Sequence, residues 1–293
     1  MAGEVAFVVL AHKQPAQVGR LLARLQPNPV FLHVDGRAPE SVFRPLADLT
    51  SASVRLLPRY KTPWASWNLV EATFAGLRQA VQAGAGHIVA LTGQCYPLWP
   101  VSKLTGYLSE RPGTSWIHQW PIPVPSQAIG DADGGLGRIT KWHLTVRGHH
   151  LRVPVRRELP AGLEAHYGQM QCCLAAPLAR WLLEETGRRP EIVRHFRRTQ
   201  APDELLIPTL AMSSPYAGEV TSGNIWYANW LSGGAHPKTL TAEDFQSIAD
   251  HARSGGDMCG PSPVKLFARK FDQVLSRDLL DRIDRDILGV PPA

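Results

Sequence analysis

The chain has 293 residues, of which 44% are hydrophobic and 19% are charged. This length and composition suit one large globular domain or two small ones, and they exclude a disordered or fibrous protein. The formal net charge of +6 favours an anionic partner or simply a basic surface. The four cysteines, two of them adjacent at Cys172 and Cys173, have neither the density nor the spacing of a disulfide framework or a zinc site.

The stretch "EVAFVVLAH" near the start is a short apolar run with no basic segment before it, and it is too short to cross a bilayer. It predicts a first strand. We therefore expect no integral membrane segment and a cytoplasmic protein with reduced thiols, and we leave peripheral contact at the inner membrane open.

Strand and helix patterns alternate through the first third of the chain. Continuous apolar runs predict strands, whereas apolar residues at helical spacing, such as Val18, Leu21, Leu22 and Leu25, predict helices. The predicted strands are 4–12, 29–35, 53–58 and 87–93, and the predicted helices are 15–26, 38–49 and 67–84. This order predicts an α/β fold, with a mainly parallel sheet that has helices on both faces.

Ligands of such sheets bind beyond the carboxyl ends of the strands, so the polar residues after each apolar run are the binding candidates. They are His12, Lys13, Asp35, Thr92 and Gly93. Asp35 stands where nucleotide-binding folds place the acid that holds a ribose hydroxyl, but no dinucleotide glycine fingerprint and no P-loop occurs. A sugar nucleotide or mononucleotide therefore fits better than a nicotinamide cofactor, with capping of the strand ends as the alternative for His12 and Asp35.

The second half of the chain is less regular. Residues 116–165 are rich in Pro, Gly and basic side chains and predict an irregular insertion, of which 134–157 contains no acid. A solvated basic loop and a phosphate contact both fit that stretch. A buried strand is then predicted at 169–176, and helices at 177–187, 202–213, 241–255 and 272–288. No linker divides the chain, so we predict one domain over residues 1–293.

The stretch "APDELLIP" places Asp203 and Glu204 after a proline and before an apolar run. Acids in the first turn of a helix meet unpaired N–H groups and the positive end of the helix dipole, so capping is one interpretation. A carboxylate beside an apolar wall can also be tuned into a general base. These residues alone leave both interpretations open.

Several stretches together resemble glycosyltransferase family 14, the core-2/I-branching N-acetylglucosaminyltransferases and peptide xylosyltransferases. In chain order they are "AHKQP", "LHVDG", "WASWNLVEATFAGL", "LTGQCYPL", "GQMQCCLAAPLARWL", "APDELLIPTL", "HPKTL" and "LFARKFD". The resemblance spans about residues 7–284 and implies a GT-A-like, Rossmann-like fold with a helical C-terminal part. It also implies a UDP-sugar donor, a carbohydrate or other glycosylatable acceptor, and inversion at the anomeric carbon. Residues 1–115 would form the nucleotide-binding half, and residues 116–293 the acceptor and catalytic half.

The resemblance assigns roles to particular residues. Glu204 would be the catalytic base, and Arg269 and Lys270 would neutralise the diphosphate of the leaving UDP. Fixed cations can replace a divalent metal there, so we expect no metal requirement and no cofactor besides the donor. Asp203 would then cap the helix or support the base. Trp67 is a donor-side candidate, and the acceptor-side candidates are Asp203, Trp226 and Trp230; core packing is the alternative for the tryptophans.

Three positions depart from the family pattern. Relatives usually have Asp where Cys95 stands and aromatic residues where Gln171 and Cys172 stand. The donor sugar, whether N-acetylglucosamine, xylose or a related sugar, therefore stays open. A catalytically degenerate family member also remains an alternative.

Two interpretations that place the chain in other classes of protein remain. A basic nucleic-acid-binding protein would explain the charge but not the carboxylates and cations at strand ends. A metal site would use the D-x-D triplet of Asp131 and Asp133, here inside the insertion, where Asp is also a common turn residue. A metal hydrolase would add His149, His150 and His166, but their spacing matches no metalloenzyme motif.

Overall fold

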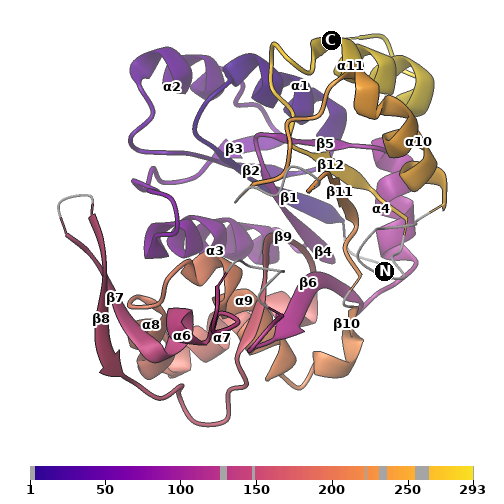
Figure 1. Ribbon diagram of the computed structural model, residues 1–293. Helices are drawn as coiled ribbons and strands as arrows, with labels where there is room; N and C mark the ends of the chain where they lie inside the picture. The colour runs from indigo at the N-terminus through magenta and orange to yellow at the C-terminus, as the bar shows by residue number, and fades with distance from the viewer. Residues whose placement is uncertain are drawn as a thin grey trace.

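The computed structural model describes residues 4–125, 131–146, 149–221, 223–230, 236–254 and 264–292, and its centre is a sheet of seven strands (Figure 1). The strand order is β10-β6-β9-β4-β1-β2-β3. The strands are β1 (Val5–Ala11), β2 (Val30–Val34), β3 (Val54–Leu56), β4 (His87–Thr92), β6 (Ser115–Pro121), β9 (His166–Ala175) and β10 (Val220–Thr221).

The sheet is mainly parallel. The pairs β1–β2, β1–β4, β2–β3 and β6–β10 are parallel, whereas β9 runs antiparallel to both of its neighbours, β4 and β6. The sequence prediction of a mainly parallel α/β sheet is therefore confirmed. Strands from both the 1–115 and the 116–293 segments lie in this one sheet.

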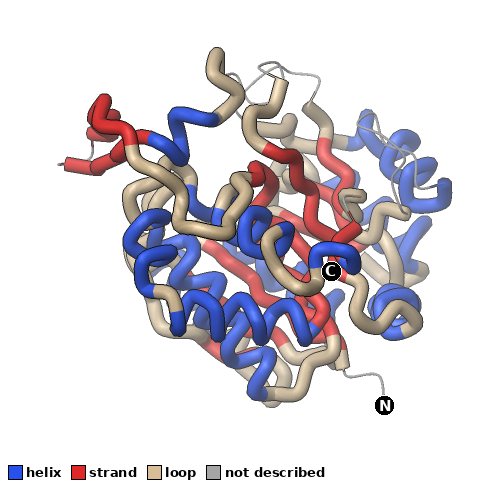
Figure 2. The backbone as a smooth tube through the Cα atoms, turned by 90° about the horizontal axis from the view of Figure 1, so that it is seen from below, coloured by secondary structure: helices blue, strands red, loops and turns tan. Residues whose placement is uncertain are grey.

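Helices cover both faces of the sheet (Figures 1 and 2). They are α1 (Pro15–Leu25), α2 (Glu40–Ala47), α3 (Trp67–Gln82), α4 (Val101–Ser109), α6 (Leu136–Thr140), α7 (Ala176–Arg188), α8 (Pro190–Phe196), α9 (Leu206–Met212), α10 (Phe245–Ser254) and α11 (Arg277–Ile283). Short 3-10 turns are η1 (Pro202–Glu204), η2 (Ala217–Glu219) and η3 (Ala242–Asp244), and a π turn, η4 (Asp284–Leu288), follows α11.

The central strand β1 shows why its sequence is apolar throughout. Phe7 and Val9 enter the hydrophobic core that α1, α10 and α11 cover, whereas Ala6 and Val8 enter the core that α3, α7 and α9 cover. Successive side chains of a strand point to opposite faces, so a strand buried on both faces has no polar positions. A Cβ on Gly76 would lie 2.3 Å from Val8 Cγ1, so α3 can approach β1 this closely only because Gly76 has no side chain.

Residues 116–165 contain more regular structure than the sequence predicted. Part of this segment forms an antiparallel hairpin of β7 (Lys141–Val146) and β8 (His149–Arg156), which extends away from the body of the protein (Figures 1 and 2). The prediction of an irregular stretch is corrected here. The hairpin was not predicted because it packs on the protein through only a few residues. Its sequence therefore lacks the regular alternation of buried and exposed side chains by which a strand is recognised.

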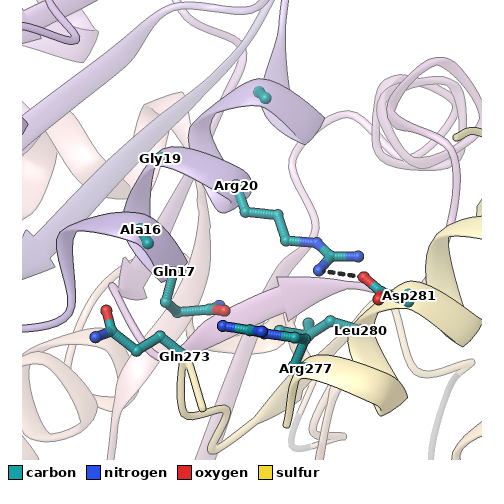
Figure 3. Close-up of a pocket in the computed structure, with 9 residues that line it drawn as sticks. Ala16, Gln17, Gly19, Arg20, Gln273, Arg277, Leu280 and Asp281 are labelled. Atoms are coloured by element: carbon teal, nitrogen blue, oxygen red, sulfur yellow. Dashed lines mark ion pairs between the residues drawn. The ribbon is translucent and has the colours of Figure 1, made fainter. Parts of the chain in front are cut away.

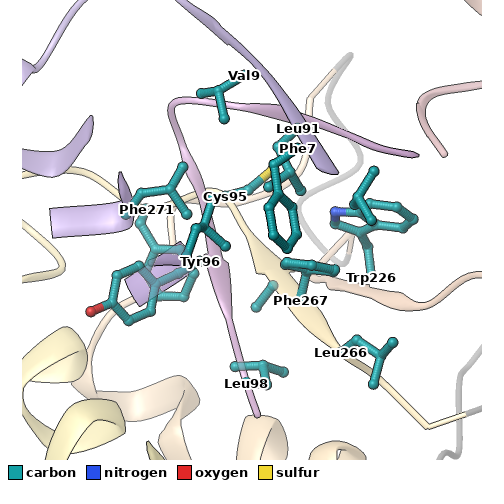
Figure 4. Close-up of a cluster of buried hydrophobic side chains, with 14 of the residues drawn as sticks. Phe7, Val9, Leu91, Cys95, Tyr96, Leu98, Trp226, Leu266, Phe267 and Phe271 are labelled. Carbon is teal, nitrogen blue, oxygen red and sulfur yellow. The ribbon is translucent and has the colours of Figure 1, made fainter. Parts of the chain in front are cut away.

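A second small sheet also escaped prediction. It has the order β11-β12-β5, with strands β11 (Trp226–Ala228), β12 (Phe267–Arg269) and β5 (Cys95–Pro97). Its inner side chains pack against β1 and β4, as Figure 4 shows for Phe7, Leu91, Cys95 and Phe267. Strands of three residues are too short for a recognisable alternation.

A buried ionic network fastens the C-terminal helices to this sheet. The Asp284 side chain is 0% exposed and accepts hydrogen bonds from Arg20 Nη2 at 2.7 Å, Arg24 Nη2 at 2.6 Å and the Tyr96 hydroxyl at 2.6 Å. Arg20 also pairs with Asp281 at 2.7 Å. One carboxylate thus joins α1, β5 and the turn after α11.

We expect Asp284→Ala to lower the free energy of unfolding by about 3–5 kcal/mol, because it leaves buried guanidinium groups without their partner. Asp286→Ala is the matched control in the same turn, since Asp286 is 41% exposed and pairs with the exposed Arg282 and Arg285. The control should change stability by less than about 1 kcal/mol. Urea unfolding followed by circular dichroism measures both values, and equal losses would contradict this account.

Candidate active site

The carboxyl ends of the parallel strands bring the predicted binding residues together. Ala11 pairs with Val34, and Leu10 pairs with Thr92, so β1, β2 and β4 end side by side. His12 and Lys13 follow β1, Asp35 follows β2, and Gly93 follows β4. His12 lies close enough to Lys13 and Asp35 to feel their charges. Burial and the positive charge of Lys13 lower the pKa of His12, and the negative charge of Asp35 partly offsets this effect.

Asp35 holds a neighbouring loop in place. Its carboxylate accepts bonds from the Arg37 amide at 2.9 Å, Arg37 Nη2 at 2.8 Å and the Thr62 amide at 3.1 Å. Burial would raise the pKa of Asp35, but these bonds outweigh burial and hold the pKa well below its usual range. Both oxygens are thus engaged within the protein, and contact with a ribose stays a prediction.

Thr92 and Gly93 shape the turn after β4. The Thr92 hydroxyl lies 3.5 Å from Cys95 Sγ, and the Gly93 amide donates to the Leu10 carbonyl at 2.9 Å. A Cβ at Gly93 would lie 2.7 Å from Val18 Cγ2, so a side chain there would push α1 away. Their expected contact with the donor stays a prediction.

The small sheet delivers two cations to the same edge. Arg269 on β12 lies opposite Cys95 and beside Ala228, and its Nη1 donates to Gln171 Oε1 on β9 at 2.7 Å. Its Nε is buried and has no hydrogen-bond partner in the described part of the chain. Burial lowers the pKa of Arg269.

Lys270 extends this positive charge towards the β1 loop. Burial and repulsion by Arg269 and Lys13 lower the pKa of Lys270 to about 8. Charges of the same sign are held together only when the fold forces them to be, so this region has a strong electrostatic preference for an anion.

Glu204, in the 3-10 turn η1, lies close enough to Arg269 for their charges to interact. Ala201, before the turn, has the left-handed φ of 50°, and the Glu204 amide donates to the Ala201 carbonyl at 3.0 Å. The Glu204 side chain is 31% exposed, and its carboxylate accepts a bond from Arg138 Nη1 at 3.3 Å. Burial raises the pKa of Glu204 more than Arg138, Tyr167 and Arg269 lower it.

The Arg138 guanidinium is itself positioned on both sides. Its Nε pairs with Asp131 Oδ2 at 2.5 Å, and it lies over the Tyr167 ring at 5.5 Å from the centroid. Tyr167 in turn makes a hydrogen bond to Glu204. Sequence reasoning missed Arg138 and Tyr167 as site residues, and only the acid-free stretch 134–157 pointed near Arg138.

Asp203 lies beside Glu204 in a different environment. Its Oδ1 is buried and has no hydrogen-bond partner among the described residues. Burial, followed by the charge of Glu204, raises the pKa of Asp203 to about 7. The capping expected from the sequence is not made by this oxygen, and the two neighbouring carboxylates titrate as a pair.

The tryptophans do not gather at one site. Trp226 is 2% exposed and stacks on Phe267 at 5.4 Å (Figure 4), which corrects the expectation of acceptor contact, since β11 turns this side chain into the core. Trp230 is 42% exposed and remains an acceptor-side candidate. Trp67 donates to Glu71 Oε1 at 2.6 Å and lies under the Arg197 guanidinium, so its donor role stays a prediction.

The D-x-D carboxylates form ion pairs with arginines. Asp131 binds Arg138, and Asp133 binds Arg152 Nη2 at 3.1 Å and the Gly137 amide at 3.0 Å. In the described part of the chain, no group of three or more His, Cys, Asp or Glu side chains is arranged to hold a metal. The side chains of His149 and His150 lie outside the described residues.

A hollow of about 550 Å³ lies elsewhere, between α1 and the segment around α11 (Figure 3). Gln17, Arg20, Arg277 and Asp281 line it, and Arg20 and Asp281 are paired with each other. None of the residues predicted to bind or react lines this hollow. The charged edge described above is therefore the candidate active site.

Carboxylates and cations with pKa values shifted by burial, at the carboxyl edge of a mainly parallel sheet, mark a candidate binding or catalytic site. Residues 5–249 match the profile of the family described as Branch, the Core-2/I-Branching enzymes. The chain therefore belongs to the Core-2/I-branching enzyme family, glycosyltransferase family 14, and is a glycosyltransferase. This confirms the family resemblance seen in the sequence.

More distant comparisons add little. A structure described as a glucose-1-phosphate thymidylyltransferase from Bacillus anthracis is 8% identical over 63% of this chain and 77% of that chain, with a TM-score of 0.33. Rv0371c from Mycobacterium tuberculosis H37Rv is 19% identical over 40% of this chain and 66% of that chain, with a TM-score of 0.25. Neither similarity supports a conclusion about this protein. No curated protein matches the sequence.

None of the described helices has the length and apolar character needed to span a bilayer.

We expect Asp203→Asn to be more stabilising at high pH than at low pH. Between the ordinary Asp pKa of 3.8 and about 7, the unfolded chain loses the proton while folded Asp203 keeps it, so wild-type stability falls as pH rises through this window. The neutral variant avoids that cost and should gain about 1–3 kcal/mol over wild type at pH 8 relative to pH 4.

Urea unfolding at several pH values measures this difference. Asp48→Asn, at an exposed position just after α2, controls for the chemical change itself. A difference between Asp203→Asn and wild type that does not vary with pH would contradict the raised pKa.

Proposed function

We propose that the protein is an inverting glycosyltransferase that moves N-acetylglucosamine, xylose or a related sugar from a UDP-sugar to an acceptor hydroxyl, forming a β-glycosidic bond. The observation that carries the proposal is the proximity of the Glu204 carboxylate to Arg269, whose charges act on each other. Lys270 follows Arg269 and interacts with Lys13 in the β1 loop. This arrangement supports the assignment of Glu204 as the base and of the two cations as the anion-binding group.

Glu204 is the better candidate for the base than Asp203. A general base needs a pKa raised towards the working pH and an oxygen that reaches the substrate. The Glu204 carboxylate is partly exposed and its pKa is raised by burial, whereas Asp203 has its Oδ1 enclosed in the protein. Arg138 and Tyr167 fix the orientation of the Glu204 carboxylate.

Arg269 and Lys270 fit the diphosphate of the donor. A leaving UDP gathers negative charge on its phosphate oxygens, and fixed cations in a partly buried site stabilise that charge. Arg269 Nε has no partner among the described residues, and the guanidinium suits bidentate bonds to phosphate. The same cations support the proposal that no divalent metal is needed.

The proposed reaction has a single displacement. Glu204 takes the proton of the acceptor hydroxyl while the acceptor oxygen forms a bond to the anomeric carbon. The bond from that carbon to the UDP oxygen breaks, and its electron pair leaves on the diphosphate beside Arg269 and Lys270. Attack from the face opposite the leaving group inverts the anomeric centre, so one carboxylate is sufficient.

We expect micromolar UDP binding in the presence of chelator, and a loss of at least about tenfold in the Arg269→Ala/Lys270→Ala variant, because charge-assisted bonds to the diphosphate are removed. Isothermal titration calorimetry with UDP and a panel of UDP-sugars measures the affinities and identifies the donor. Arg44→Ala/Arg111→Ala is the matched control, since it removes two exposed positive charges at other sites.

The same titration also tests the need for a metal and the effect of pH on UDP binding. Binding that requires manganese would contradict the metal-free site and direct attention to Asp131 and Asp133. Wild-type binding should weaken above pH 8, because Lys270, with a pKa of about 8, is charged below that pH and must take up a proton to bind an anion above it.

Glu204→Gln should lower kcat by a factor of about 100 or more with little effect on UDP affinity, because it removes proton transfer alone.

Arg138→Gln should shift the acidic limb of the pH–rate profile to higher pH, since Arg138 lowers the pKa of Glu204. Transfer to an acceptor identified by screening measures both. Full activity of Glu204→Gln would exclude Glu204 as the base, and UDP binding without turnover in the wild type would favour a degenerate family member.

A further inference from the structure

The β7–β8 hairpin exposes one apolar face. Trp142 lies opposite Val153, and Leu144 lies opposite Leu151, so these four side chains share a face of the ribbon. Trp142 is 40% exposed and Leu151 is 49% exposed, and Val155, further along β8, is 57% exposed. An apolar group of this kind on a projecting ribbon is unusual for a surface exposed only to water.

The opposite face of the hairpin is attached to the protein. His143 is 4% exposed and its Nε2 lies 2.9 Å from the Gly137 carbonyl oxygen, while Arg152, opposite His143, pairs with Asp133. The His143 amide also donates to the Arg198 carbonyl at 2.9 Å. These contacts fix the ribbon so that its apolar face points outwards.

Positive charge gathers at the base of the hairpin, next to this apolar face. No acid occurs in residues 134–157, and Lys141 and Arg156 lie opposite each other where the hairpin joins the body. Arg156 is exposed, as are Arg197 and Arg198 next to the base of the hairpin, and Arg197 pairs with Glu71 at 3.2 Å. Asp133 is paired with Arg152 of β8.

We propose that this face of the β7–β8 hairpin docks on an anionic lipid surface. A tryptophan, aliphatic side chains and flanking Lys or Arg residues are the combination that enters the headgroup region of a bilayer while the cations bind acidic headgroups. Single-stranded nucleic acid would need several aromatic rings to stack on its bases, whereas Leu151, Val153 and Val155 are aliphatic. The surface lies outside the Glu204 cluster, so the proposal does not depend on the proposed transfer reaction.

The projection of the hairpin makes such contact geometrically feasible. Figures 1 and 2 show the ribbon extending beyond the helices that cover the sheet, so its outer face can reach a flat surface before the rest of the protein does. The ribbon follows α6, which carries Arg138, so docking would also set the orientation of the candidate active site relative to the lipid.

Sedimentation with vesicles tests the proposal on the full chain. The wild type should bind 1:1 phosphatidylglycerol/phosphatidylcholine vesicles at least about tenfold more tightly than phosphatidylcholine vesicles. Leu151→Ser/Val155→Ser should weaken binding to the anionic vesicles by about tenfold or more. Val274→Ser/Leu275→Ser is the matched control, with 66% and 64% exposure at another site, and it should change binding less than twofold.

Thermal unfolding and circular dichroism test whether each variant is folded. Arg156→Gln should weaken binding to anionic vesicles but not to neutral ones. Absence of wild-type binding to anionic vesicles, equal loss in the Val274/Leu275 control, or no loss in folded Leu151→Ser/Val155→Ser would overturn the proposal. Binding to a mixed oligonucleotide that the hairpin variant loses, without vesicle binding, would assign the surface to nucleic acid and overturn it as well.

Discussion

The arrangement of the candidate active site depends on the partly buried guanidinium of Arg269. A cation removed from water is tolerated where surrounding groups compensate for its lost hydration, and the Arg269 guanidinium finds its hydrogen-bond acceptor on a different sheet from its own strand. Its strand β12 is held between β11 and β5, whereas its hydrogen-bond acceptor, Gln171, belongs to the large sheet. The large and small sheets therefore meet at this side chain, and any change in their relative position would remove its acceptor.

Several ionisable groups at this edge of the sheet favour their neutral forms more than they would in water. Burial raises the pKa values of Asp203 and Glu204 and lowers those of Arg269 and Lys270. An anion beside the cations would relieve their repulsion, and loss of a proton at Glu204 would be aided by the positive charge opposite. Groups of this kind, perturbed by burial and by each other, are characteristic of sites that bind or transform charged substrates.

The parts of the molecule that were predictable are those fixed by local pattern. Strands β1, β2 and β4 read as continuous apolar runs because both of their faces are buried, and parallel pairing then places His12, Asp35 and Gly93 at one edge. The contact of Arg138 with Glu204 joins residues 66 positions apart, and the pairing of Arg269 with Cys95 depends on strands of three residues. No local pattern encodes such pairings. Trp226 was misassigned for a related reason, since an aromatic residue in a short strand carries no sign of which face it occupies.

The strand order also determines when during synthesis each strand can pair with its neighbours. β9 lies between β4 and β6, and β12 lies between β5 and β11, so each gap is filled by a segment that comes later in the sequence than at least one of its neighbours. During translation the edge of β4 stays open until the ribosome has released residue 175, and the cations at the carboxyl edge arrive only with residues 269 and 270. All seven strands of the large sheet, up to β10, thus leave the ribosome before Arg269 and Lys270, whereas α11 and Asp284 follow these two cations.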